Sequence, residues 1–83
     1  MKPDDRELNM KSELNRLIDY AVTCINDFGD AHNLPYAEAF RYLSQYGALD
    51  FLEEFYEVEH TLPQQDVLED MSAICRQNGG VLA

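Results

Sequence analysis

The stretch of sequence that decides the fold is ALDFLEEFYEV, residues 48–58, which directly follows Gly47. At 100° per residue, its apolar side chains cover one half of a helical wheel and its acidic side chains the other. The apolar half consists of Ala48, Leu49, Phe51, Leu52, Phe55, Tyr56 and Val58, and the acidic half of Asp50, Glu53, Glu54 and Glu57. The pattern predicts an amphipathic helix over about residues 48–58 with its apolar half in a core.

Two further helices are predicted on either side of this stretch. A short helix over about residues 36–46 ends at Gly47, a residue that readily adopts the positive φ of a helix C-terminus. A last helix over about residues 62–78 begins near Thr61, which together with Gln64 matches a capping box.

A long helix is predicted over about residues 8–32. Its apolar face repeats at three- and four-residue spacing and comprises Leu14, Leu17, Ile18, Ala21, Cys24, Ile25 and Phe28. Two start signals are present, at residues 3–5 and at residues 12–13, and the choice between them stays open. Asn33 is the expected left-handed cap, with Leu34 folding back.

The predicted fold class is therefore all-α, a compact four-helix domain that spans residues 1–83. Residues 1–11 are expected to be frayed or disordered, and residues 79–83, which begin with Gly-Gly, to form a flexible tail. The aromatic side chains are expected in the core, namely Tyr20, Tyr36, Phe40, Tyr42, Tyr46, Phe51, Phe55 and Tyr56.

The charge balance argues against two classes of partner. Sixteen acidic and six basic side chains give a formal net charge of −10. Nucleic acid and anionic membrane surfaces both attract Lys and Arg, so neither is an expected partner. The polar first eleven residues do not resemble a signal peptide, and we expect a cytoplasmic protein.

The chemistry-bearing residues do not form a recognisable constellation. Cys24 and Cys75 lie on apolar helix faces and are expected to be buried and reduced, although a single bridge between neighbouring helices is left open. No nucleophile motif or phosphate-binding loop occurs. The one Glu-x-x-His, Glu57 with His60, lacks the second motif that a di-iron site needs. We expect no enzyme, cofactor or metal.

Residues 40–49 resemble the first helix, glycine turn and second helix of a helix-turn-helix motif, so a DNA-associated regulator is the alternative function. The second helix of such a motif lies in the major groove and contacts the DNA bases. Here that helix carries four carboxylates and no Lys or Arg, which opposes binding to the DNA phosphates.

The acidic face is the candidate partner-binding site, formed by Asp50, Glu53, Glu54 and Glu57. Its like charges lie four residues apart, with no Lys or Arg in the helix to offset them. The face is either a solvated surface that keeps an acidic protein soluble or a docking surface for a basic protein partner. Glu59 breaks the pattern because it falls on the apolar half. Either the helix ends before Glu59, or Arg41, Arg76 or His60 pairs with its carboxylate.

From about Leu17 to Gly80 the chain resembles the bacterial family called domain of unknown function 3791. The resemblance rests on Gly47 and Leu52, on a Tyr-x-x-x-His-Thr motif at Tyr56, His60 and Thr61, and on the final Gly-Gly. Glu59 stands where that family usually has an apolar residue such as Leu.

The resemblance implies a cytoplasmic helical protein with an accessory or antitoxin-like role beside ADP-ribosyltransferase-like companions, and it supplies no catalytic residues. His60 and Thr61 are expected to form a turn and a helix cap. We therefore expect a non-catalytic protein-interaction or regulatory module. Homodimerisation through spare apolar surface stays open.

Overall fold

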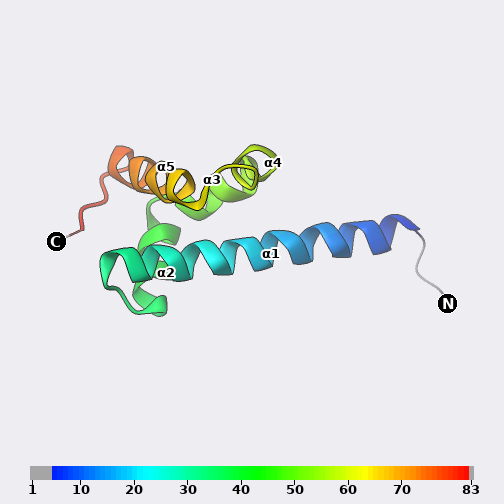
Figure 1. The fold of residues 1–83 in the computed structure, drawn as a ribbon, viewed down its shortest axis with the longest axis horizontal. Coiled ribbons are helices and arrows are strands. Elements are labelled where there is room, and N and C mark those ends of the chain that lie inside the picture. The colour runs from blue at the N-terminus through cyan, green and yellow to red at the C-terminus, as the bar shows by residue number, and fades with distance from the viewer. Residues whose placement is uncertain (1–4, 83) are drawn as a thin grey trace.

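A computed structural model describes residues 5–82 of the chain, with side chains described from Ser12 to Leu82. The helices are α1 (Asp5–His32), α2 (Tyr36–Gln45), α3 (Ala48–Glu54), α4 (Tyr56–Glu59) and α5 (Gln64–Gln77), shown in Figure 1. No strand occurs in the described range, so the predicted all-α class is confirmed.

Helix α1 runs along the longest axis of the molecule, which measures 52 × 24 × 21 Å (Figure 1). Helix α2 packs on the C-terminal end of α1, and α3 and α5 pack on each other and on α1. The N-terminal part of α1, blue in Figure 1, extends beyond the other helices. The fold is thus a small globule built around one end of a long helix.

The end of α1 has the predicted cap. Asn33 adopts a left-handed conformation with φ 56°, and the N–H of Leu34 donates a 2.8 Å hydrogen bond to the carbonyl of Gly29. A Cβ on Gly29 would lie 2.8 Å from the Leu34 carbonyl oxygen, so this position needs glycine for close approach. Toward its other end α1 is helical back to Asp5, where the described residues begin, so the start signal at residues 12–13 lies inside the helix.

Gly47 joins α2 to α3 in the predicted left-handed conformation, with φ 84°. The side-chain amide of Asn78 donates a 2.7 Å hydrogen bond to the neighbouring carbonyl of Tyr46. The α2–α3 turn is therefore tied to the end of α5.

The single helix predicted over residues 48–58 is wrong, because the structure breaks it into α3 and α4 at Phe55. Phe55 has φ −108° and ψ 21°, and its carbonyl accepts from Val58 three residues on as well as from Glu59 four residues on. The bend brings the ring of Tyr56 edge-on to Tyr20 of α1, with centroids 5.3 Å apart. This long-range contact is invisible to a helical wheel.

The predicted capping box at Thr61 and Gln64 is also wrong. Helix α5 starts after Pro63, and no side chain caps it. The hydroxyl of Thr61 instead donates to the Val58 carbonyl at 2.7 Å, and the amide of Gln64 donates to the Cys24 sulfur at 3.6 Å. Thr61 therefore belongs to the preceding turn, and Gln64 to the contact between α5 and α1.

The core lies where the C-terminal half of α1 meets α2, α3 and α5. Its buried hydrophobic side chains are Cys24, Ile25, Phe28, Ala39, Leu43, Ala48, Leu52, Val67, Met71 and Cys75. Among the aromatic side chains expected there, Tyr20, Tyr42, Tyr46 and Phe51 pack against it and Tyr56 is half-buried. Tyr36, Phe40 and Phe55 are exposed, so their placement in the core was wrong, as it was for Val58. Leu14 and Ile18, on the apolar face of α1, are also exposed.

The chain after α5 folds back on the core. Gly79 has φ 89°, and the N–H of Gly80 donates a 2.7 Å hydrogen bond to the Cys75 carbonyl. Leu82 packs against the core. The flexibility expected for residues 79–83 stays a prediction. So does the fraying expected for residues 1–11, of which residues 1–4 lie outside the described residues, as does Ala83.

Candidate functional site

The four carboxylates of the predicted acidic face are all exposed. Asp50, Glu53 and Glu54 lie on α3, and Glu57 lies on α4. Within residues 12–82, none of the four forms an ion pair with a basic side chain. The structure thus divides the face between two helices and leaves its charge without an intramolecular counterion in that range.

Two large apolar side chains lie within this run of carboxylates. Phe55 is 45% exposed and Val58 is 59% exposed, because the bend at Phe55 turns them away from the core. The ring of Phe55 also contacts that of Phe51, at a centroid distance of 5.1 Å. We call the resulting patch the acidic–apolar surface, and it comprises Asp50, Glu53, Glu54, Phe55, Glu57 and Val58. The helical wheel missed its apolar part because it assigned Phe55 and Val58 to the core.

The motif residues of this region form the turn that ends α4. The imidazole of His60 stacks on the ring of Tyr56 with centroids 4.6 Å apart, and its Nδ1 lies 2.6 Å from the Tyr56 carbonyl oxygen. The Thr61 hydroxyl closes the same turn on Val58. These contacts give Tyr56, His60 and Thr61 local structural roles, and Gly47 has its own in the α2–α3 turn.

Glu59 is the one buried charged residue within the side-chain range that the structure describes. It is 5% exposed, and its Oε2 has no hydrogen-bond partner there. Burial, hydrogen bonding to Asp70, and the nearby charges of Asp70 and Asp66 raise the pKa of Glu59 to about 7. Glu59 and Asp70 therefore form an acid–acid contact between α4 and α5.

Neither sequence-based expectation for Glu59 holds. Helix α4 includes Glu59 instead of ending before it. The groups that perturb its pKa are acids, whereas a basic partner had been expected from Arg41, Arg76 or His60. The bend at Phe55 explains both differences, because it rotates Glu59 toward the acidic side chains of α5.

A second buried polar group lies close to Glu59. The hydroxyl of Tyr20 is buried without a hydrogen-bond partner, and burial, together with the neighbouring Cys24 thiol, raises its pKa. The charge of Glu59 contributes to that rise. Tyr20, Cys24, Glu59 and Gln64 thus form a polar cluster where α1, α4 and α5 meet. In the sequence, the signal for this polar cluster was an acidic residue, Glu59, on the apolar half of the helix predicted over residues 48–58.

The two thiols are free and buried, as predicted. Burial raises the pKa of both Cys24 and Cys75. Raised pKa values keep the thiols protonated and unreactive at neutral pH. Elsewhere in the described residues, no group of three His, Cys, Asp or Glu side chains is placed to hold a metal ion.

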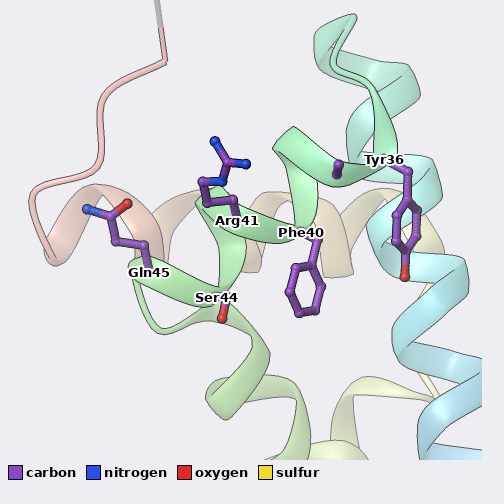
Figure 2. A pocket seen from close by; sticks show the side chains of 6 residues that line it. Tyr36, Phe40, Arg41, Ser44 and Gln45 are labelled. Atoms are coloured by element: carbon purple, nitrogen blue, oxygen red, sulfur yellow. The ribbon is translucent and has the colours of Figure 1, made fainter.

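The outer face of α2 carries a shallow hollow of about 590 Å³ (Figure 2). It is lined by Tyr36, Ala37, Phe40, Arg41, Ser44 and Gln45. Figure 2 shows that the labelled side chains diverge from the helix and do not converge on a point. An open hollow without converging polar groups is poorly suited to fixing a small ligand.

Fold and site together define a small all-helical domain with an exposed acidic–apolar surface. The chain belongs to the family described as protein of unknown function (DUF3791), whose family model matches residues 19–78. That match covers both the acidic–apolar surface and the polar cluster around Glu59. Neither the comparison with curated proteins nor that with solved structures found a match. None of the helices in the described part of the chain is both long enough and apolar enough to cross a membrane.

Proposed function

We propose that this protein is a non-catalytic interaction module that binds a basic protein partner through the acidic–apolar surface. The observation that carries the proposal is the exposure of Phe55 and Val58 among four exposed carboxylates. An apolar centre with a charged rim is the usual composition of a protein-binding patch.

The charges of this surface set the chemistry of the partner. Four carboxylates without an intramolecular counterion in residues 12–82 favour Lys and Arg side chains that surround an apolar group. A cytoplasmic companion protein that this domain neutralises or regulates, in an antitoxin-like or accessory role, would meet that description. The DNA-associated alternative gains no support, because α3 carries carboxylates where a DNA-contacting helix needs Lys and Arg side chains.

The test is affinity capture from the native host followed by direct binding to the recovered partner. We expect Glu53→Lys/Glu57→Lys and Phe55→Ser/Val58→Ser to lose the partner that the wild-type protein captures. The matched control is Glu38→Lys/Glu69→Lys, which changes the net charge equally at exposed positions on α2 and α5. Thermal melts would confirm that each variant is folded.

Equal capture by the wild type and both surface variants would refute the proposal. Loss of capture by the control as well as by Glu53→Lys/Glu57→Lys would show that net charge, rather than this surface, governs binding. A binding assay with duplex DNA at low salt tests the DNA-associated alternative, and we expect no binding in that assay.

A further inference from the structure

Helix α4 is held in the fold by a single buried side chain. It is four residues long, and none of its side chains belongs to the hydrophobic core. Glu57 and Val58 are exposed and Tyr56 is half-buried, so Glu59 alone is buried. Figure 1 shows α4 at one end of the pair that α3 and α5 form. A segment with so few buried apolar contacts is of the kind that opens while the rest of a protein stays folded.

The neighbouring helices bring no positive charge to Glu59. Asp66 and Asp70 face it from α5, and Tyr20 and Cys24 face it from α1. The Tyr20 hydroxyl and Oε2 of Glu59 are both buried without a hydrogen-bond partner in the side-chain range that the structure describes. An ionised Glu59 would therefore face two other carboxylates and only neutral polar groups.

Helix α3 and the ends of α4 do not supply a counterion either. The charged side chains of α3, and Glu57 on α4, are all acidic and exposed. His60, which directly follows α4, is exposed and stacks on Tyr56. No Lys, Arg or His is among the groups within residues 12–82 that affect the charge of Glu59.

The contact between Glu59 and Asp70 is favourable only while the two carboxyl groups share a proton. A protonated Glu59 can donate a hydrogen bond to the Asp70 carboxylate, which holds α4 on α5. If that proton leaves for water, two carboxylates face each other at a buried site, and their repulsion acts across the α4–α5 contact. These surroundings raise the pKa of Glu59 to about 7, so the proton is lost in the neutral range.

We propose that Glu59 is a proton-controlled latch, which holds α4 on α5 through Asp70 when protonated and releases α4 when deprotonated, while the core of α1, α2, α3 and α5 stays folded. The released segment includes Glu57 and Val58, so the acidic–apolar surface is complete only while the latch is closed. The latch is a property of the protein alone and does not rest on the proposed function.

Amide hydrogen exchange of the full chain, followed residue by residue by NMR, tests the latch. The reporters are the N–H groups of residues 58–62, which donate backbone hydrogen bonds in α4 and its turn. After correction for the intrinsic exchange rate, we expect their protection to fall at least about tenfold from about pH 5.5 to about pH 7.5. Low concentrations of urea should leave this exchange unchanged, because a local opening exposes little surface, but should accelerate exchange of the buried amides of α1 and α5.

Three variants assign the effect to the latch. Glu59→Gln should abolish the fall in protection, because its amide keeps the shape, donates to Asp70 and does not titrate. Asp70→Asn should make the fall smaller, since an Asn amide can donate to an ionised Glu59. The matched control is Glu69→Gln, which removes one charge at an exposed position of α5 and should behave like the wild type.

Three outcomes would overturn the proposal. If the amides of residues 58–62 share the opening free energy and urea dependence of the core amides, α4 opens only when the whole domain unfolds. A fall in protection of the same size in Glu59→Gln would mean that another group controls the opening. A carbon-13 titration that places the pKa of Glu59 near its ordinary value of 4.5 would mean that this carboxyl is ionised throughout the range.

Discussion

The side-chain amide of Asn78 donates a 2.7 Å hydrogen bond to the backbone carbonyl of Tyr46 and so joins the end of α5 to the end of α2. Gly47 lies directly beneath this contact, because a Cβ at that position would be 3.0 Å from Asn78 Nδ2. Two elements that are distant in sequence are therefore joined across a turn that only glycine adopts easily.

Replacing Gly47 with Ala should destabilise the fold for two separable reasons. The positive φ of 84° costs an L-residue about 1–2 kcal/mol, and the new Cβ crowds Asn78. Urea denaturation of Gly47→Ala, Asn78→Ala and the double variant would measure both. We expect Gly47→Ala to cost less when Asn78 is already Ala. Strict additivity would show that the two positions are not coupled.

The adjacent glycines after α5 should differ in why they resist substitution. Gly79 has φ 89°, and a Cβ at that position would have no neighbour within 4 Å, so Gly79→Ala should cost only the conformational penalty of about 1 kcal/mol. A Cβ on Gly80 would meet Tyr42 Oη at 2.8 Å and the Cys75 carbonyl oxygen at 2.9 Å. Gly80→Ala should therefore cost more, roughly 1–3 kcal/mol. Equal costs in chemical denaturation would contradict this distinction.

Glu59 should make the protein less stable as the pH rises toward neutrality. Its pKa of about 7 in the folded state exceeds the ordinary value of 4.5, so the folded state binds more protons between these values. The contribution is fully present below about pH 4.5 and is lost as the pH rises through about 7. The difference corresponds to something on the order of 3 kcal/mol.

The Glu59→Gln variant isolates this contribution, since it keeps the shape and removes the titration. We expect it to be more stable than the wild type at about pH 8 and similar to it at about pH 5. Glu69→Gln, at an exposed position of α5, is the control for the general relief of negative charge. A Glu59→Gln profile parallel to that of the wild type would show that Glu59 does not titrate in this window.

The thiols of Cys24 and Cys75 should react only when the protein unfolds. Both are fully buried, and burial raises the pKa of each. Stopped-flow labelling with an aromatic disulfide reagent should give a rate that follows the unfolding equilibrium as urea is added. Fast labelling of either thiol in native buffer would mean that it is accessible in the folded state.

The bend at Phe55 can be tested by two alanine substitutions within residues 48–58. Leu52 is 1% exposed and Val58 is 59% exposed. Leu52→Ala should cost about 2–5 kcal/mol, whereas Val58→Ala should change stability by less than about 0.5 kcal/mol. Large costs for both would indicate one continuous helix that buries its apolar half.

Local signals in the chain were enough to predict the all-α class and most helix boundaries. Asn33 and Gly47 adopt the left-handed conformations that their positions in the sequence predict, because such caps depend on a few neighbouring residues. Periodicity likewise predicted that Cys24, Phe28 and Leu52 face a core, since one side of each helix must be buried.

Contacts between residues that are distant in sequence determined the break at Phe55, the exposure of several apolar side chains and the burial of Glu59. A helical wheel assigns Phe55, Val58 and Glu59 to one side of one helix, but it contains no information about Tyr20 or Asp70 on the neighbouring helices. In the structure Tyr56 contacts Tyr20, Phe55 and Val58 are exposed, and Glu59 is buried beside α5. Likewise, Leu14 and Ile18 lie on the apolar face of α1 but are 56% and 50% exposed, and a helical wheel gives no information about how far along α1 the other helices extend.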